Sequence, residues 1–279
     1  MSLTNESVVV ITGAASGIGR ALAVRLAQEP IAGIAISDVN HQALTETRKL
    51  MGGPELKVSI HRVDVADEAE MSAFAGEVNR DHGRITHVIN NAGVALGGTL
   101  REVSLDDLRW LIGINFWGVV YGTKLFLPYL EKEKSAHIIN FSSVFGLIAP
   151  PGQAAYAASK FAVRGFTESL RHELEGSNIA VSVVHPGGVK TNIANHAKIG
   201  AGVSLTKSEL EKRTKKINRN LSRTLPAEAA EVIVRGIKRR NPRILIGGDA
   251  LQLSLFARLF PRRYNSIINF ISRGKLKVV

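Results

Sequence analysis

Tyr156 and Lys160 are the pair of side chains in this sequence best suited to acid–base chemistry. Their spacing of four places them on one face of a helix, if the segment is helical. An ammonium beside a phenol favours the phenolate, so we expect Lys160 to lower the Tyr156 pKa from its ordinary value near ~10 towards neutrality. Ser143, at the end of a predicted strand, can donate a hydrogen bond to the same substrate oxygen. Tyrosine and lysine four residues apart also occur on solvated helix faces. The interpretation of this pair as an acid–base site, which would protonate a carbonyl or deprotonate an alcohol, therefore depends on the elements around it.

The composition is that of an ordinary globular α/β protein. The chain has 279 residues, 45% hydrophobic and 22% charged, and is long enough to bury a sizeable core. It has no cysteine, which excludes disulfides, thiolate metal sites and cysteine nucleophiles. The first residues do not have the pattern of an export signal, and no uncharged apolar run reaches the ~18–20 residues of a spanning helix. We therefore expect a cytoplasmic protein that at most lies on a membrane surface.

Positive charge is concentrated in the last third of the chain. Residues 1–189 hold 16 Lys and Arg against 19 Asp and Glu, whereas residues 190–279 hold 20 against 5. This asymmetry suggests an anionic partner, such as a lipid surface, a phosphorylated substrate or carrier, or nucleic acid. A solvated basic face is the alternative. Because the chain has no aromatic stacking platform or recognisable motif for it, we do not expect nucleic-acid binding.

A glycine-rich turn follows the first predicted strand. Residues 8–11 are a β-branched apolar run typical of a buried strand, and residues 20–29 have the spacing of a helix. Between them, Gly13 permits a tight turn, Gly17 lets the backbone approach a phosphate, and Gly19 allows close helix–strand packing. The helix N-terminus adds free N–H groups and a partial positive charge, so we favour a nucleotide pyrophosphate over an ordinary turn. The predicted contacts are Gly13, Ser16, Gly17, Ile18 and Gly19.

Asp38 follows the second predicted strand, residues 31–37. A carboxylate at this place can accept a hydrogen bond from a ribose 2′-hydroxyl and repels a 2′-phosphate. Ser16, Ser37 and Val39, at the places where a basic residue would favour NADP, are all uncharged. Asp38 can alternatively cap the next helix. The pattern favours NAD(H), with NADP(H) as the alternative.

The third and fourth predicted strands, residues 57–63 and 86–90, also end in polar groups. Asp64 can face an adenine amino group, or it can simply cap the following helix. Asn91 begins a turn that keeps the backbone close to a ligand, although it can equally brace the sheet. The predicted contacts at these two ends are Asp64, Val65, Asn91, Ala92 and Gly93.

Asn115 lies inside a predicted helix over residues 106–129. Asparagine is a poor mid-helix residue, so we expect a local opening that leaves a backbone carbonyl free to hold a water. A surface asparagine is the alternative, but Ile112, Ile114 and Phe116 around it favour burial.

The fifth and sixth predicted strands, residues 136–141 and 180–184, lead to Ser143 and to His185. His185 is more typical of a core or strand-end histidine than of a catalyst. The Pro-Gly turn after it would cover the nicotinamide end of a cofactor, and the Thr191 hydroxyl can reach a carboxamide. The predicted contacts in this part, including those on the helix over residues 154–174, are Tyr156, Lys160, Pro186, Gly187, Val189 and Thr191.

Six strands alternating with helices predict an α/β fold with a doubly wound, Rossmann-type parallel sheet. Residues 243–246 add a seventh strand, after a helix over residues 226–240. In such sheets, ligands lie across the carboxyl ends of the strands. Because the candidate residues each follow a strand end, one site can collect them all.

With these motifs assembled, the chain resembles the short-chain dehydrogenase/reductase family in its single-domain form, over roughly residues 7–248. The resemblance rests on the Thr-Gly-x-x-x-Gly-x-Gly turn, Asn-Asn-Ala-Gly from residue 90, Asn115, Ser143, Tyr-x-x-x-Lys and the Pro-Gly turn. It implies that Tyr156 is the general acid/base and that Lys160 binds the nicotinamide ribose and depresses the Tyr156 pKa. Ser143 would polarise the substrate oxygen, and Asn115 would hold a proton-relay water. The family also implies homodimers or homotetramers packed through the helices that contain Asn115 and Tyr156. We expect no metal site.

The last part of the chain is where this sequence becomes individual. We expect residues 1–248 to form the catalytic domain, with a lid at 191–225 that includes a basic helix over 207–221, and residues 249–279 to form an extension. The extension begins with an apolar helix too short to span a bilayer, followed by interleaved arginines, lysines and apolar residues. It suits a helix lying in a membrane interface, a flap over the substrate pocket or a subunit interface.

Two hypotheses from different classes follow. The first is an NAD(H)-dependent oxidoreductase of a hydrophobic secondary alcohol or ketone, with an NADPH-dependent reductase of an acyl-CoA or acyl-carrier thioester as its alternative. The second is a non-catalytic, membrane-associated binding protein that senses a nucleotide.

Overall fold

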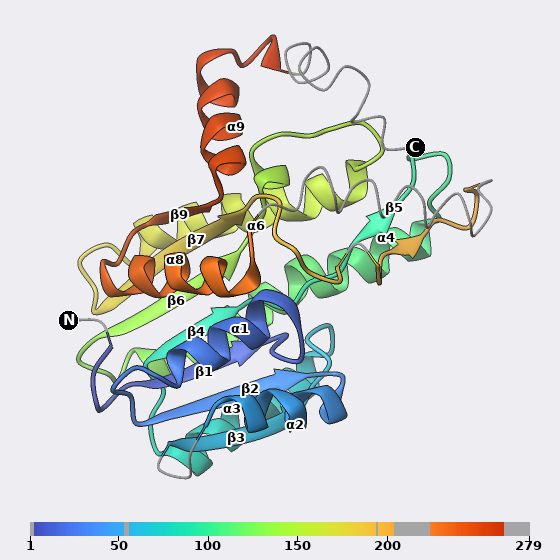
Figure 1. Ribbon diagram of the computed structural model, residues 1–279. Coiled ribbons are helices and arrows are strands. Elements are labelled where there is room, and N and C mark those ends of the chain that lie inside the picture. The colour runs from blue at the N-terminus through green and yellow to red at the C-terminus, as the bar shows by residue number, and fades with distance from the viewer. Residues whose placement is uncertain (1–2, 53–55, 194, 204–223, 265–279) are drawn as a thin grey trace.

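A seven-stranded parallel sheet forms the centre of the molecule. The computed structural model describes residues 3–52, 56–193, 195–203 and 224–264 (Figure 1). The strand order is β3-β2-β1-β4-β6-β7-β9, and every neighbouring pair is parallel. The strands are β1 Val8–Thr12, β2 Gly33–Asp38, β3 Lys57–Arg62, β4 His87–Asn90, β6 Ala136–Phe141, β7 Ile179–Pro186 and β9 Arg243–Ile246. The chain reverses its direction of travel across the sheet between β1 and β4, which is where doubly wound folds bind ligands.

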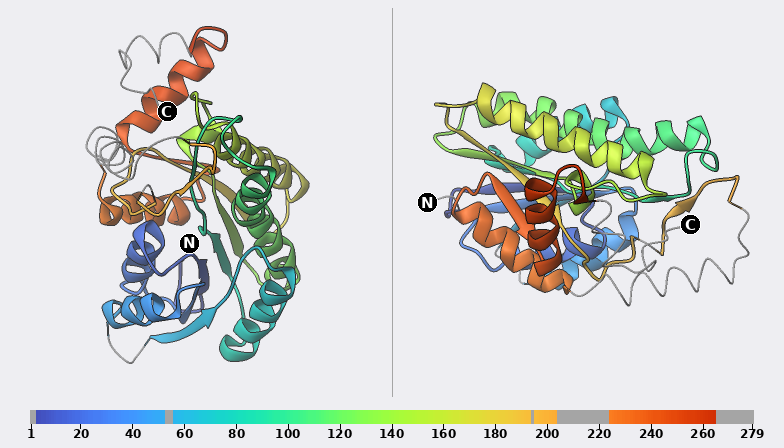
Figure 2. Two further views of the ribbon diagram at one scale, coloured as in Figure 1. Left: turned by 90° about the vertical axis from the view of Figure 1, so that its right-hand side faces the viewer. Right: turned by 90° about the horizontal axis from the view of Figure 1, so that it is seen from above.

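Helices cover both faces of this sheet (Figure 2). They are α1 Gly17–Leu26, α2 His41–Leu50, α3 Glu68–His82, α4 Leu105–Ile112, α5 Gly118–Leu130, α6 Ala154–Glu173 and α8 Pro226–Lys238, and a further helix, α9 Gly248–Leu259, stands apart from these layers. One core cluster joins α1, α2 and α8 to the sheet through side chains such as Leu22, Leu44 and Ile233. A second joins α3 and α5 to the opposite face through Phe74 and Phe126. Every residue of β1 and β6 is buried, as their apolar runs predict, whereas β3 at the edge of the sheet is partly exposed.

The sequence-predicted strands and helices of the sheet are confirmed, with shifts of a few residues at their ends. The largest change is at α1, which begins at Gly17 rather than at residue 20, so that Gly17 and Gly19 lie in its first turn while Gly13 precedes it. The predicted strand over 180–184 extends to Pro186. The predicted basic helix over 207–221 and the tail after residue 264 lie outside the described residues.

The predicted helix over residues 106–129 is interrupted, as expected from Asn115. A π-helical turn, Gly113–Trp117, separates α4 from α5, and Asn115 within it is fully buried. The surface alternative for this asparagine is therefore wrong. Within the described residues, the stretch Leu105–Leu130 is the one helix apolar and long enough to cross a bilayer, with a mean hydropathy of 1.2. Because α5 packs on α3 and on the sheet, we assign this stretch to the core of the fold.

A second, two-stranded sheet was not predicted. Leu96–Gly97 (β5) pairs with Lys198–Ile199 (β8), which ties the segment after β7 to the segment after β4. The Lys198 ammonium lies 2.7 Å from the buried Asp107 carboxylate and 5.1 Å from the centre of the Trp110 ring. This contact anchors the chain where it leaves the site towards residue 204.

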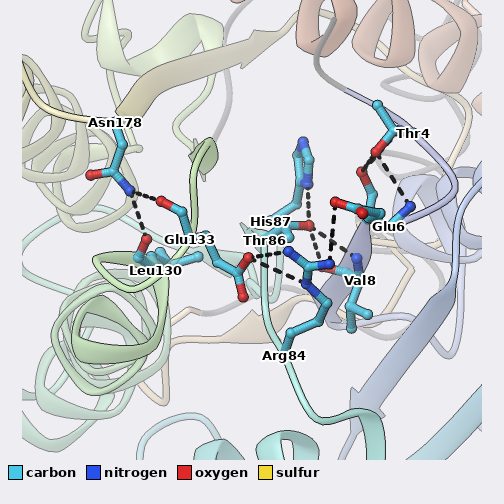
Figure 3. A network of polar contacts seen from close by, with 10 residues as sticks. Thr4, Glu6, Val8, Arg84, Thr86, His87, Leu130, Glu133 and Asn178 are labelled. Carbon is cyan, nitrogen blue, oxygen red and sulfur yellow. Dashed lines mark hydrogen bonds and ion pairs between the residues drawn. The ribbon is translucent and has the colours of Figure 1, made fainter.

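Polar contacts join the strands at their amino-terminal ends, opposite the carboxyl ends that carry the candidate residues (Figure 3). The Thr86 hydroxyl accepts from Val8 N and donates to Val8 O, joining β1 to the start of β4. Arg84 binds Glu133 at 2.5 Å and Glu6 at 3.4 Å. The Asn178 amide donates to the carbonyls of Leu130 and Glu133. These contacts fix the amino-terminal ends of the strands, whereas loops follow their carboxyl ends.

Candidate active site

The glycine turn forms one wall of a cavity of about 390 Å³ at the carboxyl ends of the strands. Gly13 and Gly17 have φ values of 68° and 55°, which favour glycine. A β-carbon at Gly13 would lie 2.7 Å from the Ala92 backbone, and one at Gly19 would overlap the Gly13 carbonyl oxygen. Ser16 precedes α1 without capping it through its side chain, and the first turn holds no acidic residue. The free N–H groups at this helix end therefore remain available to an anion.

Asp38 faces the cavity and is tied to the glycine turn. Its carboxylate accepts hydrogen bonds from Ala15 N and Asn40 N, each at 3.1 Å. Asn40, not Asp38, caps α2, because its side chain accepts from Ala43 N at 3.0 Å. The capping alternative for Asp38 is therefore wrong. No arginine is among the described residues that line the cavity.

Asp64 also lines the cavity, together with Val65. The cap of α3 is Asp67, whose carboxylate accepts from Glu70 N at 2.9 Å. Asp64 instead accepts from Ala66 N at 2.9 Å within its own turn. The capping alternative for Asp64 is therefore wrong as well, and its carboxylate takes part in the cavity lining.

Asn91 braces the sheet, as one of its two predicted roles required. Its side-chain amide donates to the carbonyls of Thr12 and Gly13, at 2.9 and 3.0 Å. The Thr12 hydroxyl accepts in return from Asn91 N and Ala92 N. These bonds lock the ends of β1 and β4 together, so the glycine turn and the Asn-Ala-Gly turn form one rigid rim. Asn91 nevertheless lines the cavity, so the structure leaves room for both roles.

Tyr156, Ser143 and Lys160 meet at the other end of the same cavity. The Ser143 hydroxyl forms a hydrogen bond with the Tyr156 phenol, and the Phe145 ring meets the Tyr156 ring edge to face with centroids 6.0 Å apart. The Lys160 ammonium is buried and donates to the Phe141 carbonyl at 3.1 Å. The Ser142 hydroxyl donates to the Lys160 carbonyl at 2.8 Å. Helix α6 is thus fastened to the end of β6, which fixes the distance between the phenol and the serine.

The pKa of Tyr156 differs from the sequence-based expectation. Burial raises its pKa, and the hydrogen bond from Ser143 opposes this only in part. The expected lowering by Lys160 is therefore wrong for the protein as it stands in this structure. The reason is geometric: the ammonium is turned to the Phe141 carbonyl and lies 5.8 Å from the centre of the tyrosine ring. Burial lowers the pKa of Lys160 to about 8, so this ammonium still carries its charge near pH 7.

Asn115 lies behind the cavity wall rather than in it. Its side chain accepts from Val94 N at 2.8 Å and donates to Val94 O at 3.0 Å and to the Ser159 hydroxyl at 3.2 Å. A β-carbon at Gly93 would lie 3.2 Å from the Asn115 oxygen and 3.3 Å from the Lys160 nitrogen. The Asn115 oxygen and the Lys160 ammonium therefore both lie beside the space that Gly93 leaves open.

His185 supports the serine from behind. It is fully buried, and its Nδ1 atom is 2.9 Å from the Ser143 carbonyl oxygen. Desolvation lowers its pKa to about 4, so the ring is neutral near pH 7. This agrees with its interpretation as a strand-end histidine.

Asp249, which had no role in the sequence analysis, supports the Pro-Gly turn after β7. Its carboxylate accepts from Gly188 N at 2.7 Å and fills the space beside Gly187 that a side chain would otherwise occupy. The first turn of α9 is thereby fixed to a turn that lines the cavity. A lone aspartate after two glycines carries no sequence signal of such a contact, because the two segments are far apart in the chain.

All the predicted cofactor contacts line this one cavity, whereas Asn115 alone among the predicted catalytic residues does not. Sequence reasoning missed the lining side chains supplied by neighbours of the motifs and by the chain after β7. These are Val39, Val63, Val94, Ala95, Ile114, Phe141, Ser142, Asn192, Ile193 and His196. The last three reach the cavity only because β8 pairs with β5, and a two-residue strand leaves no periodic pattern to detect.

Comparisons with known proteins bear on this geometry. A family model described as short chain dehydrogenase matches residues 7–201. The chain is 40% identical over 270 residues to SadH of Mycobacterium tuberculosis, covering 96% of each protein. It is 38% identical over 184 residues to the 3-oxoacyl-[acyl-carrier-protein] reductase FabG of Thermotoga maritima, covering 66% of this chain and 74% of that one. A solved structure from Burkholderia phymatum, a short-chain dehydrogenase/reductase in complex with NAD, has a TM-score of 0.84 at 31% identity, covering 93% of this chain and 95% of that one.

Proposed function

The chain belongs to the short-chain dehydrogenase family of nicotinamide-dependent oxidoreductases, and on this premise we propose that it interconverts a hydrophobic secondary alcohol and its ketone using NAD(H). The observation that carries this proposal is the convergence of Tyr156, Ser143 and Lys160 at one end of a cavity whose other end is a glycine cradle.

The cavity fits a dinucleotide. Its volume of about 390 Å³ is that of a small-molecule site. In this proposal the free amino end of α1 binds the pyrophosphate, Asp38 binds the adenosine ribose, and Lys160 binds the second ribose. When bound, the nicotinamide takes up or supplies the hydride.

The protein's own residues handle the substrate oxygen and its proton. Tyr156 removes the hydroxyl proton during oxidation and returns it during reduction, acting as the general base or acid. Ser143 holds the same oxygen by a hydrogen bond from its place beside the phenol. Asn115 positions Val94 and Ser159 around Lys160, and we assign to it the support of a water that relays the proton.

The cofactor preference rests on Asp38, since the cavity offers a carboxylate and no arginine at that end among its described lining residues. The NAD complex of the Burkholderia phymatum relative supports the same preference. We expect Asp38→Ala to relax the preference for NADH over NADPH by on the order of tenfold or more, because a 2′-phosphate would no longer meet a negative charge. Ratios of kcat/KM for the two cofactors measure this. Equal use of NADH and NADPH by the unmodified protein would contradict it.

An apolar substrate is favoured by the surroundings of Tyr156. Its ring belongs to a cluster with Val94, Leu96 and Leu111, and Phe145 packs on its other side. Initial rates of NADH formation over secondary alcohols of increasing chain length test this. We expect kcat/KM to rise with chain length, by at most about 0.8 kcal/mol, or roughly fourfold, for each buried methylene. Flat or absent rates along the whole series would overturn the assignment.

An acyl thioester reductase using NADPH is the second candidate, supported by the likeness to FabG and by the 20 basic residues after position 189. A phosphorylated carrier would meet that charge. Turnover of a 3-oxoacyl thioester with NADPH, exceeding that of the free alcohols with NAD, would favour it. A nucleotide sensor without catalysis is the third candidate, and it is separated from both by the tyrosine variant described in the Discussion.

An aromatic surface on the π-helical turn and α6 supports a homo-oligomer, which is the general state in this family. Trp117 is 47% exposed and stacks on Tyr121 at 5.7 Å, while Phe161 on α6 is 39% exposed. We expect Trp117→Glu to halve the molar mass measured by sedimentation equilibrium, because a buried unpaired charge opposes association. Leu50→Glu, at an exposed leucine on α2, is the matched control. An unchanged mass in the Trp117 variant would place the interface elsewhere.

We assign the catalytic domain to residues 1–248 and a C-terminal extension to residues 249–279, with a cytoplasmic location. The boundary is supported by Gly247, which ends β9 and precedes α9 with a φ of 90°. Asp249 then links the extension to the cavity, so we expect the two parts to act together.

A further inference from the structure

Helix α9 has one face packed on the protein and one face left in solvent. Leu253 and Ala257, with Tyr264 beyond the helix, pack against Val144 and Ile148 in the loop that follows Ser143. Figure 1 shows α9 standing out from the layers of helices around the sheet, and the turned view in Figure 2 shows the same separation. The packed face of α9 thus reaches the loop that follows Ser143, while the opposite face has no partner among the described residues.

The solvent face of α9 is apolar. Leu251, Leu255 and Leu259 follow one another at intervals of four and are 61%, 55% and 60% exposed. Phe260, directly after the helix, is 44% exposed. Residues four apart lie on the same side of a helix, so the three leucines form a continuous stripe. We call Leu251, Leu255, Leu259 and Phe260 the leucine stripe.

Positive charge accompanies the leucine stripe. Arg258 is exposed and lies on the same side of α9, seven residues after Leu251, and the exposed Arg262 and Arg263 follow in the next turn. Residues 250–279 contain six basic residues and no acidic one. The acid of the first helical turn, Asp249, is bound to Gly188 N on the packed side. An apolar stripe edged by arginines is the composition of a helix that lies in a membrane interface.

We propose that the leucine stripe of α9 docks this enzyme on an anionic lipid surface, with the side chains of the stripe between the acyl chains and Arg258, Arg262 and Arg263 at the lipid phosphates. A second copy of the chain fits the stripe less well. In a two-fold contact through the same stripe, neither copy would offer a carboxylate to the arginines of the other, because residues 250–279 contain no acidic residue and Asp249 is bound to Gly188 N. A lipid surface supplies apolar depth and negative charge together.

Docking in this way would give the site access to lipophilic molecules held in the bilayer. The face of α9 opposite the stripe packs on the loop that begins at Ser143, and Asp249 holds the Pro-Gly turn. The lipid surface would therefore lie one helix away from both walls of the substrate end of the cavity. Docking itself does not depend on the proposed reaction and can be measured without turnover.

Vesicle sedimentation of the full chain tests the proposal. Phosphatidylcholine vesicles with and without phosphatidylglycerol serve as probes, at low and high salt. We expect binding to the vesicles that contain phosphatidylglycerol, weakening as salt rises, and little binding to phosphatidylcholine alone. Leu255→Gln should lower the partition coefficient by on the order of tenfold. Arg258→Glu should lower it by a similar factor through its charge.

Matched controls keep the test specific to α9. Leu50→Gln removes an equally exposed leucine from α2, and Arg101→Glu reverses an exposed charge in the loop before α4. Both should bind vesicles as the unmodified protein does. Failure of the full chain to bind anionic vesicles would overturn the proposal, as would binding that the Leu255 and Arg258 variants leave unchanged. A fall in molar mass by light scattering in Leu255→Gln, without vesicle binding, would assign the stripe to a subunit contact instead.

Discussion

Tyr156→Phe is expected to lower kcat by roughly 10²- to 10⁴-fold, the contribution of a positioned general acid or base. The substitution removes only the phenol oxygen, so the ring keeps its edge-to-face contact with Phe145 and its place in the cluster with Val94. The glycine cradle and Asp38 lie at the other end of the cavity and do not touch the ring. Nucleotide affinity and thermal stability should therefore stay close to those of the unmodified protein.

Steady-state rates, nucleotide titration by fluorescence and a melting curve together check this expectation. The rate of alcohol oxidation should rise with pH in the unmodified protein, because the deprotonated phenol is the base and burial raises its pKa. That rise should vanish in the variant. Tyr129→Phe, on α5 and outside the described cavity lining, is the control and should retain full activity. If Tyr156→Phe turned over substrate at the normal rate, the tyrosine would not be the acid–base group, and a sensing role would gain support.

The sheet could be predicted from the sequence because each buried strand is a short apolar run that ends at a polar or glycine residue. Local features that depend on the conformational preference of a single residue could also be predicted. Asn115 is an example, since a mid-helix asparagine costs helix stability unless its side chain finds a buried partner. The structure provides that partner in Val94, and the helix opens at this residue.

Contacts between segments distant in the chain could not be predicted in the same way. Asp38 and Asn40 are both suitable helix caps, and only the fold shows that Asn40 caps α2 while Asp38 bonds to Ala15. The sign of the Tyr156 pKa shift depended on where the Lys160 ammonium points, and spacing along a helix does not determine that. His196 lines the cavity, and Asp249 supports the turn beside it, only through the path of the chain after β7.

The cofactor end and the substrate end of the site are held in place by different kinds of contact. The cofactor end is built from motifs locked by hydrogen bonds between side chains and backbone groups of neighbouring strand ends, such as those between Asn91 and Thr12. The substrate end depends on side-chain contacts of α9 and of the segment through β8. We therefore expect substitutions at the cofactor end to abolish binding outright, and those at the substrate end to change which molecules are bound.

Among substitutions that add a single methyl group, Gly19→Ala is expected to weaken nucleotide binding most. The added carbon would overlap the Gly13 carbonyl oxygen and would press on the Asn91 amide nitrogen, two groups that hydrogen-bond to each other at 3.0 Å. Neither can move freely, because Asn91 is also bonded to Thr12. Overpacking of a fixed backbone costs about 1–3 kcal/mol of unfolding free energy, and displacing the amino end of α1 should weaken nucleotide binding by at least about tenfold.

Two other helical glycines provide controls for this prediction. A β-carbon at Gly76 in α3, or at Gly165 in α6, would meet no atom within 4 Å. Alanine at either place should stabilise the protein by about 0.5–1 kcal/mol, because it only removes backbone freedom from the unfolded chain. Urea unfolding and nucleotide titration of the three variants separate local overlap from a general intolerance of glycine substitution. A Gly19→Ala protein as stable as the Gly76→Ala protein, with normal nucleotide affinity, would mean that the cradle is looser than the structure describes and that the pyrophosphate lies elsewhere.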